Sequence, residues 1–423
     1  MTETTPAAQE NTILVGLEHD GVTRWDVEDS LSELRQLAAT AGAHVVDVVV
    51  QKLEKPTAPY YIGKGKAEEV AKQCAEKSVT SLIFDDELSP AQGRNLETLT
   101  SRKVLDRTQL ILDIFAKRAR SREGRLQIEL AQLHYLLPRL TRMWTHLSRQ
   151  TGGIGTRGPG ETQLEVDRRR VQERIARLER DLKEVRKNRT VQREGRLRRN
   201  WPVAALVGYT NAGKSSLLNR LTGAGVLAED KLFATLDPTT RQVILPNRQK
   251  LLLTDTVGFI RKLPHTVIES FKATLEEVKL ADILIHVVDA SHPQFREQME
   301  AVDATVKELD AAGKQTVIVF NKRDALANPD SLDLLLDRHP GSVAISARTG
   351  EGIDSFFQEL EVRLGSWRMK SRLRIPTDAS ALLAELHRVG HVLETTYDGD
   401  FALVTAHVPP ELASRLDLYL IAE

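Results

Sequence analysis

GYTNAGKS, residues 208–215, follows the apolar run VAALV and precedes SLLNRL, which has the pattern of a helix. The stretch matches G-x-x-x-x-G-K-[ST], and a phosphate-binding loop of this type requires a strand before it and a helix N-terminus after it. We expect the backbone N–H groups from Asn211 to Ser215 to surround phosphates, Lys214 to bridge the β- and γ-phosphates, and the Ser215 hydroxyl to coordinate Mg²⁺. The stretch therefore predicts a P-loop nucleotide-binding domain of the α/β class.

DTVG, residues 255–258, overlaps the end of the apolar run LLLTDT. Asp255 is placed to reach the Mg²⁺ shell through a water, and the Gly258 N–H can sense a γ-phosphate. The next residue is Phe259, where many GTPases have a glutamine that orients the attacking water. Because a phenyl ring cannot hold that water, we expect slow hydrolysis by the isolated protein and a faster rate when a partner orders the switch segments.

NKRD, residues 321–324, ends the run TVIVFNK and determines the choice of base. Guanine presents its N1–H and 2-amino donors side by side, and the Asp324 carboxylate can accept from both. Adenine would leave these charge-assisted bonds, each worth about 1.5–3 kcal/mol, unmade. SAR, residues 346–348, would direct the Ala347 N–H to guanine O6. The order of these motifs, each at the end of a strand pattern, predicts a GTP site.

FATLDPTTR, residues 233–241, lies between the P-loop and DTVG and is the expected first switch. A threonine hydroxyl in this segment should complete the Mg²⁺ shell. Thr235, Thr239 and Thr240 all qualify by their chemistry.

Residues 13–107 alternate short apolar runs with helical patterns. The runs at 13–18, 44–50, 81–86 and 103–107 are typical of strands, and residues 27–40, 66–77 and 90–101 of the helices between them. This order predicts a small parallel α/β domain.

The formal net charge of the 423-residue chain is zero, but the charge is unevenly distributed. Residues 1–116 carry 12 basic and 19 acidic side chains, residues 117–200 carry 23 and 10, and the remainder carries 24 and 30. A basic segment between acidic ones predicts a polyanionic partner, with a solvated helical face as the alternative.

Two heptad patterns occupy this basic segment. Apolar residues recur at positions 126, 130, 133, 137, 140, 144 and 147, and again at 171, 175, 178, 182 and 185. They predict an antiparallel helical hairpin with a kink at Pro138. TGGIGTRGPGETQ, residues 151–163, would form its tip. Because this glycine-rich loop follows a helix rather than a strand, we do not expect it to hold a nucleotide.

The glycines of the tip would let the backbone approach another surface closely, and neighbouring arginines would contact RNA phosphates with little sequence preference. A flexible turn is the alternative. The candidate RNA-binding residues are Arg149, Gly153, Gly155, Arg157, Gly158, Gly160, Arg168, Arg169 and Arg170.

Strand patterns continue from Val203 to Ser346, and after Gly365 three strands with two short helices predict a small α+β domain. We expect an N-terminal α/β domain (1–116), a basic antiparallel helical hairpin (117–190), a linker (191–202), a P-loop GTPase domain (203–366) and a C-terminal α+β domain (367–423).

A single cysteine, Cys74, excludes an internal disulfide and is typical of a reducing compartment. The N-terminal MTETTPAAQENT lacks the layout of a signal peptide, and no apolar run approaches the roughly 20 residues that cross a bilayer. We expect a cytoplasmic monomer without a membrane anchor.

The chain resembles the HflX family of translation-factor-related GTPases over almost its whole length. The resemblance rests on GYTNAGKS, FATLD, DTVGFIRKLP, NKRD and SAR, on YYIGKGKAEE and FDDELSPAQGRNLE, and most specifically on QIELAQLHYLLPRL and GGIGTRGPGETQLEVDRR. It implies a cytoplasmic GTPase that binds ribosomes, chiefly the large subunit, and splits stalled or idle ribosomes under stress. The glycine loop would then lead toward ribosomal RNA near the peptidyl transferase region.

The resemblance also implies site residues. It selects Thr235 as the metal ligand beside Ser215, and Phe259 fits the family's apolar replacement of glutamine, which leaves the catalytic residue unassigned. It further suggests ATP binding at YIGKGK (61–66), with a surface turn as the alternative, and K⁺ beside the phosphates near Asn211. The expected GTP-binding residues are Gly208, Tyr209, Thr210, Asn211, Ala212, Gly213, Lys214, Ser215, Phe233, Ala234, Thr235, Leu236, Asp237, Asp255, Thr256, Val257, Gly258, Asn321, Lys322, Arg323, Asp324, Ser346, Ala347 and Arg348.

Two other classes of function stay open. A GTPase of RNA modification or ribosome assembly shares the nucleotide motifs, but a transfer-RNA-modifying type would favour a reactive cysteine near the C-terminus, where this chain reads LDLYLIAE. A dinucleotide-binding module needs G-x-G-x-x-G at the start of the first helix, where this chain reads HDGVTRW.

Overall fold

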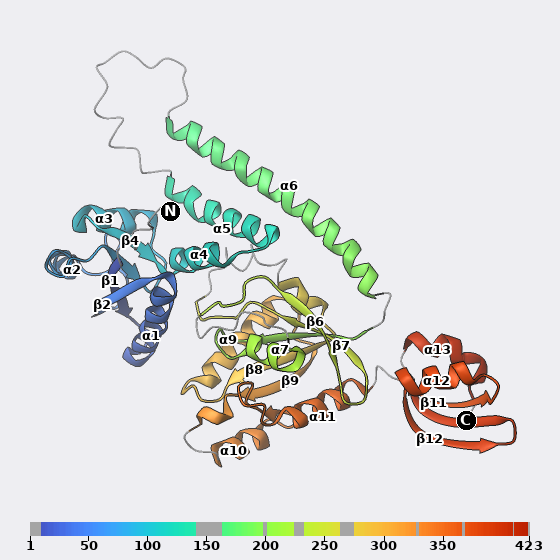
Figure 1. The fold of residues 1–423 in the computed structure, drawn as a ribbon. Coiled ribbons are helices and arrows are strands. Elements are labelled where there is room, and N and C mark those ends of the chain that lie inside the picture. The colour runs from blue at the N-terminus through green and yellow to red at the C-terminus, as the bar shows by residue number, and fades with distance from the viewer. Residues whose placement is uncertain are drawn as a thin grey trace, which may run out of the picture. The chain divides into compact units, whose positions relative to one another are not determined.

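The computed structural model describes residues 10–140, 163–197, 201–223, 232–262, 275–326, 330–365, 369–408 and 410–421. The chain divides into two compact units (Figure 1). The first comprises Met1–Val185, Lys231–Phe233 and Lys262–Phe271, and the second comprises Arg186–Asp230, Ala234–Arg261 and Lys272–Glu423.

The first unit contains a four-stranded parallel sheet in the order β2-β1-β3-β4. Its elements are β1 (Glu10–Glu18), α1 (Arg24–Ala41), β2 (Ala43–Lys52), α2 (Lys64–Glu76), β3 (Ser81–Phe84), α3 (Pro90–Thr100), β4 (Lys103–Asp106) and α4 (Arg107–Arg118). The predicted parallel α/β arrangement is confirmed. The sequence pattern missed α4, because the residue that caps it, Asp106, lies within the last predicted strand and accepts a hydrogen bond from the Gln109 N–H.

A buried ionic cluster lies at the carboxyl end of β3. Arg107 is 2% exposed and donates to the carboxylates of Asp85 and Glu33. Lys262, which belongs to the first unit, donates to Asp85 and Asp86 at 2.6 Å each. Burial opposes the charged form of Asp85, but Arg107 and Lys262 outweigh it and lower the pKa of this carboxyl. Open α/β sheets often bind ligands at the carboxyl ends of their strands. At this end of β3 the carboxylates pair instead with the side chains of Arg107 and Lys262.

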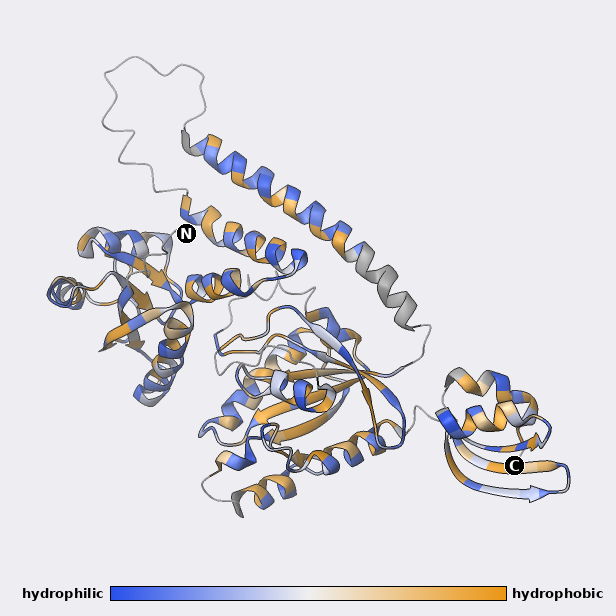
Figure 2. Cartoon of the chain, in the orientation of Figure 1, coloured by the Kyte–Doolittle hydropathy of each residue, from blue (hydrophilic) through white to orange (hydrophobic). Residues whose placement is uncertain are grey.

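Two helices, α5 (Arg122–Leu140) and α6 (Gln163–Leu197), carry the basic heptad segment. The guanidinium of Arg174 on α6 donates to both carboxylate oxygens of Glu129 on α5, at 2.7 and 2.8 Å. The predicted seam of α6 is confirmed at three of its five positions. Ile175, Leu178 and Leu182 are buried on a helix whose other residues are mostly exposed, whereas Val171 and Val185 are intermediate in exposure. Figure 2 shows this narrow apolar stripe along a mainly hydrophilic helix.

The predicted seam of α5 is only half-buried. Its leucines at 126, 130, 133 and 137 are intermediate in exposure, whereas the buried residues are Gly124, Gln127, Ile128, Ala131 and Tyr135. The physical reason is a second packing partner, since α5 also packs against α4, and the Tyr135 hydroxyl donates to Asp106 at 2.8 Å. Pro138 lies in the last turn of α5. The seam positions 144 and 147 and the glycine-rich tip lie outside the described residues.

The second unit contains a six-stranded sheet in the order β10-β9-β8-β5-β7-β6, in which β6 pairs antiparallel with β7 and the other pairs are parallel. Its elements are β5 (Val203–Gly208), α7 (Lys214–Thr222), β6 (Thr239–Ile244), β7 (Lys250–Asp255), β8 (Ile283–Asp289), α9 (Phe295–Glu308), β9 (Gln315–Asn321), η1 (Arg323–Ala325), α10 (Asp330–Arg338), β10 (Val343–Ala344) and α11 (Ile353–Arg363).

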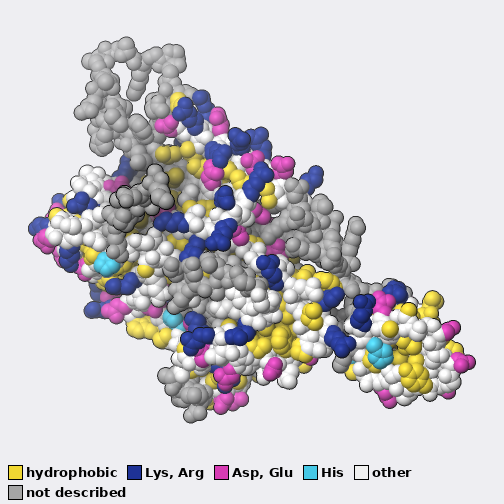
Figure 3. Space-filling model, viewed as in Figure 1, with side chains coloured by type: hydrophobic (Ala, Val, Ile, Leu, Met, Phe, Trp, Pro, Cys, Tyr) yellow, Lys and Arg dark blue, Asp and Glu magenta, His cyan; other side chains and the backbone are white. Residues whose placement is uncertain are grey.

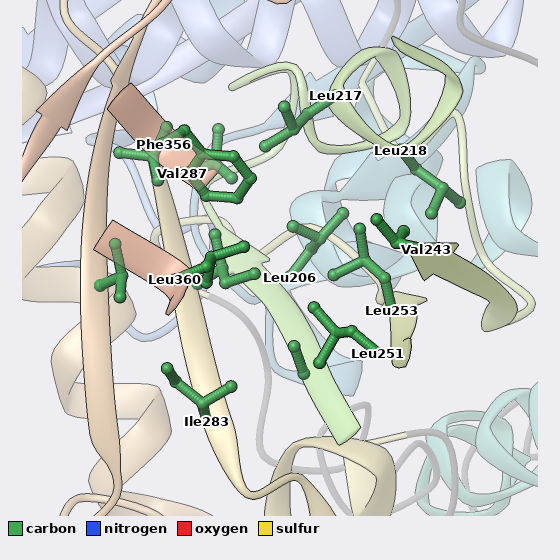
Figure 4. Close-up of a cluster of buried hydrophobic side chains, with 14 of the residues drawn as sticks. Leu206, Leu217, Leu218, Val243, Leu251, Leu253, Ile283, Val287, Phe356 and Leu360 are labelled. Atoms are coloured by element: carbon green, nitrogen blue, oxygen red, sulfur yellow. The ribbon is translucent and has the colours of Figure 1, made fainter. Parts of the chain in front are cut away.

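The core of this sheet fixes the two helices that flank the nucleotide motifs. Leu217 and Leu218 of α7 and Phe356 and Leu360 of α11 are at most 1% exposed and pack with the strands (Figure 4). Full burial of such a side chain stabilises the fold by about 1.5–3 kcal/mol. The start of α7, where the P-loop ends, is therefore held firmly against the sheet.

Three antiparallel strands in the order β11-β13-β12 complete the second unit. The elements are β11 (Met369–Pro376), α12 (Ser380–Val389), β12 (His391–Asp398), β13 (Phe401–Val408), α13 (Pro410–Leu416) and η3 (Asp417–Tyr419). Every second residue of β13 is buried, namely Ala402, Val404, Ala406 and Val408. This alternation confirms the predicted α+β arrangement, with one face of the sheet packed against a core.

Candidate nucleotide site

The P-loop turns sharply between β5 and α7. Gly213 has a φ of +95°, and a Cβ at this position would lie 2.2 Å from Nδ2 of Asn321, so the turn requires glycine. The turn ends at Lys214, the first residue of α7. The unpaired N–H groups and the dipole of a helix N-terminus favour an anion at this point.

Lys214 is 6% exposed, and its ammonium donates to the carbonyl oxygens of Gly208 and Tyr209 at 3.0 and 2.7 Å. Burial lowers the pKa of Lys214 to about 8, although the nearby Asp255 carboxylate favours the charged form. A phosphate beside this ammonium would raise the pKa of Lys214 again and so stabilise its charged form.

Three oxygen-bearing side chains meet next to Lys214. The Ser215 hydroxyl donates to Oδ2 of Asp255 at 2.6 Å and lies 2.7 Å from the Thr235 hydroxyl. Asp255 is fully buried, and its Oδ1 has no hydrogen-bond partner among the described residues. Burial raises the pKa of this carboxyl, against the effects of Ser215 and Lys214. A divalent cation that prefers oxygen ligands, such as Mg²⁺, fits this set of donors.

The motif DTVG, residues 255–258, lies beside the P-loop. A Cβ at Gly258 would lie 2.7 Å from Cα of Thr210 and 3.0 Å from Nζ of Lys214. Phe259 is 1% exposed, its N–H donates to the Gly208 carbonyl at 3.1 Å, and its carbonyl accepts from the Thr210 N–H at 2.7 Å. The residue at the glutamine position is therefore a buried phenyl ring, whose side chain has no polar group to orient a water.

Asn321 braces two loops. Its Nδ2 donates to the Ala212 carbonyl at 2.8 Å, and its Oδ1 accepts from the Ala347 N–H at 2.9 Å. The sequence assigns that N–H to guanine O6, whereas in this structure it serves Asn321. The difference arises because the amide of Asn321, which is 2% exposed, lies between the P-loop and the SAR loop and needs a donor there.

Asp324 interacts with the SAR loop. The Ser346 hydroxyl and the Arg348 guanidinium stabilise its carboxylate and lower its pKa despite some desolvation. Nζ of Lys322 lies 2.7 Å from Oδ2 of Asp289, the last residue of β8, and the two side chains form an ion pair. A guanine that uses the Asp324 carboxylate has to share it with Arg348 or replace that contact.

Phe233, one of the expected GTP-binding residues, packs in the core of the first unit. It belongs to the first unit, is 1% exposed, and packs edge-to-face on Phe115 of α4 with 4.6 Å between ring centroids. It is a core residue in this structure. The other expected GTP-binding residues, Asn211, Ala234, Leu236, Asp237, Thr256, Val257 and Arg323 among them, lie in the second unit.

Sequence reasoning missed two side-chain contacts of the site. The phenol oxygen of Tyr209 accepts a hydrogen bond from the Arg261 N–H at 2.8 Å. Arg220 of α7 donates to the carbonyl oxygens of Ala347, at 3.1 Å, and of Arg348. Neither contact corresponds to a sequence motif, because each joins a side chain to a main-chain group that is distant in the sequence.

The candidate RNA contacts are described only in part. Arg168, Arg169 and Arg170 lie on α6 and are exposed. Arg169 and Arg170 approach Glu173 and Asp167 at 3.8 Å, too far for strong pairs. The remaining candidates, Arg149, Gly153, Gly155, Arg157, Gly158 and Gly160, lie outside the described residues.

Comparison with known proteins places these motifs in one family. Residues 28–116 match a family model described as GTP-binding GTPase N-terminal, residues 118–196 one described as GTP-binding GTPase Middle Region, and residues 203–322 one described as 50S ribosome-binding GTPase. A curated protein of Lacrimispora saccharolytica named GTPase HflX is 50% identical over 391 residues, which cover 92% of each chain. The chain belongs to the HflX family of GTPases. As a member of the HflX family, it binds and hydrolyses GTP.

Other HflX relatives agree with this assignment. GTPase HflX of Escherichia coli is 46% identical over 365 residues, 86% of this chain and 85% of the relative. Among solved structures, a complex of the protein SsGBP with GDP is 25% identical, covers 85% of this chain and 99% of its own, and has a TM-score of 0.46. None of the helices in the described parts of the chain is long and apolar enough to cross a membrane.

Proposed function

We propose that this HflX-family GTPase binds ribosomes, chiefly the large subunit, and splits or rescues stalled and idle ribosomes under stress. The model matched by residues 203–322 is described as a 50S ribosome-binding GTPase. The observation that carries the proposal is the exposed arginine row Arg168–Arg170 on α6, because clustered arginines suit the phosphates of RNA. Figure 3 shows basic side chains, interspersed with acidic ones, along the helix.

GTP is proposed to bind across the loops at the strand ends of the second unit. Its phosphates lie at the N-terminus of α7 with Lys214, and guanine meets Asp324. Ser215 and Thr235 hold Mg²⁺, and the buried Asp255 anchors the same cluster. Bound Mg²⁺ would neutralise charge on the phosphates. K⁺ beside Asn211 is part of the proposal, and comparing hydrolysis in KCl and NaCl at equal ionic strength tests it.

We infer slow hydrolysis by the isolated protein from the burial of Phe259. A partner that orders the switch segments would supply the missing positioning of water, and in this proposal the partner is the ribosome. In this proposal the glycine-rich tip (151–163) leads toward the RNA. The proposed domains are residues 1–116, 117–190, 191–202, 203–366 and 367–423. The protein acts as a cytoplasmic monomer.

The test reverses the charge of the row, with Arg168→Glu, Arg169→Glu and Arg170→Glu in one variant. Sedimentation with large subunits should fall, and the salt dependence of binding should become flatter, because fewer counterions are released. GTP affinity should stay unchanged. The matched control is Arg35→Glu, Lys55→Glu and Lys72→Glu, three exposed residues of the first unit, which makes the same change of charge elsewhere. Equal sedimentation of both variants would refute the role of α6.

A second candidate, a GTPase of RNA modification or ribosome assembly, shares the nucleotide motifs. Light scattering of intact ribosomes separates the two. Splitting lowers the scattering when this protein and GTP are added, and a modification or assembly factor leaves intact ribosomes unchanged.

A further inference from the structure

Tyr209, the second residue of the P-loop, touches two parts of the nucleotide site at once. Its carbonyl oxygen accepts from the Lys214 ammonium at 2.7 Å. Its phenol oxygen accepts from the main-chain N–H of Arg261 at 2.8 Å. The side chain is 5% exposed, so the hydroxyl is placed by packing and not by chance at a surface. All of these residues lie in the second unit.

The contact extends a short parallel bridge between the P-loop and the segment after DTVG. Phe259 pairs with Tyr209 in this bridge, through hydrogen bonds to Gly208 and Thr210. In an extended segment, the N–H groups of residues two apart point to the same side, so the Arg261 N–H also faces the P-loop. The P-loop backbone has by then turned away, since Asn211 has a φ of +62°. The phenol oxygen of Tyr209 takes the place of the next main-chain acceptor.

This bridge determines where Gly258 lies. Gly258 precedes Phe259 directly, and there is no room for a Cβ between it and Thr210. With no glutamine at position 259, hydrolysis depends on where the main chain of this segment holds the Gly258 N–H relative to the γ-phosphate. The hydrogen bond from the Arg261 N–H to Tyr209, three residues after Gly258, fixes the far end of this segment.

We propose that Tyr209 is a positioning residue for GTP hydrolysis, which holds the segment 258–261 against the P-loop through the hydrogen bond from the Arg261 N–H to its phenol oxygen. Tyr209 acts through the main chain and donates no proton to the reaction. The prediction concerns the rate of the chemical step and does not depend on the ribosome.

Tyr209→Phe removes one oxygen and keeps the ring. The single-turnover rate of bound GTP should fall about 3- to 10-fold, as expected for the loss of one hydrogen bond. GDP affinity should stay within about twofold, because the Tyr209 carbonyl and the loop turn are unchanged. Tyr397→Phe, at a side chain that is 72% exposed, is the control and should change neither quantity.

Amide hydrogen exchange tests the hydrogen bond itself. In Tyr209→Phe the Arg261 amide should exchange faster, while the Phe259 amide, bonded to the Gly208 carbonyl, keeps its protection. Arg261→Ala should retain slow exchange at position 261, because the bond uses the main chain. An unchanged rate of hydrolysis, an unchanged Arg261 amide, or a loss of GDP affinity parallel to the loss of rate would each overturn the proposal.

Discussion

The hydroxyl oxygens of Ser215 and Thr235 lie 2.7 Å apart, although one belongs to the start of α7 and the other to the first switch. Ser215 also donates to the fully buried Asp255. Hydroxyls that meet beside a buried carboxylate are oriented in advance for one small cation. Of the three threonines that qualify by chemistry, the structure brings Thr235 to Ser215, while Thr239 and Thr240 begin β6.

Thr235→Ala should lower the rate of GTP hydrolysis by at least about tenfold, because it removes an oxygen that the proposed Mg²⁺ needs when the triphosphate is bound. Affinity for GDP should change little, since Ser215 remains. The measurement is single-turnover hydrolysis together with titration of a fluorescent GDP. Thr239→Ala is the matched control, and an equal loss of rate in both variants would contradict the assignment.

Asp324→Asn should weaken GTP binding by at least about 100-fold and reduce the preference over ATP, because two charge-assisted hydrogen bonds to guanine, about 1.5–3 kcal/mol each, are lost. Arg348→Ala tests whether the ion pair between Arg348 and Asp324, rather than the contact of Asp324 with guanine, determines the preference for GTP. Since the Arg348 side chain is 79% exposed, its pair with Asp324 contributes little, and this variant should keep the preference for GTP. Competition binding with both nucleotides measures the effect, and an unchanged preference in Asp324→Asn would sink the guanine assignment.

The sequence predicts that the nucleotide motifs lie close together, because most of them follow a parallel strand. β5, β7 and β9 bring the P-loop, Asp255 and Asn321 to one edge of the sheet, so order along the chain translates into proximity. The same local patterns predict the parallel sheet of the first unit and the α+β arrangement at the end of the chain.

The sequence does not predict contacts that depend on packing between distant residues. The heptad pattern of α5 implies one partner. In the structure α5 packs against α4 and is joined to α6 by the Arg174–Glu129 pair, and its most buried face is shifted. Phe233 lies two residues before the switch threonine in sequence but packs on Phe115. The hydrogen bond from Arg261 to Tyr209 leaves no trace in the residue pattern, because its donor is a backbone N–H that every residue except proline has.

Arg107→Met should destabilise the first unit by about 3–5 kcal/mol, because it removes the buried guanidinium that pairs with the carboxylates of Asp85 and Glu33. Denaturant unfolding followed by circular dichroism measures this loss. Arg24→Met is the control, since Arg24 and Glu28 form an exposed pair, and it should cost less than about 1 kcal/mol. Similar unfolding midpoints for the two variants would show that the buried cluster contributes no more than a surface pair.

His286 of β8 should make the second unit sensitive to mild acid. It is 3% exposed, and burial, with a smaller effect of the Lys214 charge, lowers its pKa to about 4. Asp303, 3.8 Å from Nδ1, does not compensate, because its side chain is 63% exposed. The unfolded chain has a histidine pKa near 6.5, so between about pH 6.5 and 4 it binds more protons than the folded protein. Stability therefore rises with pH across this window and falls on acidification.

The expected loss for His286 is on the order of 2–3 kcal/mol between pH 6.5 and 4, and about half of that by pH 5. Urea unfolding at pH 7 and pH 5 measures it, with His286→Val as the variant in which this group no longer titrates. The difference in unfolding free energy between the two pH values should be smaller in His286→Val than in the unmodified chain. His44→Ala provides the control for an exposed histidine and should leave the difference unchanged. If His286→Val loses as much stability on acidification as the unmodified chain, other groups cause the acid sensitivity.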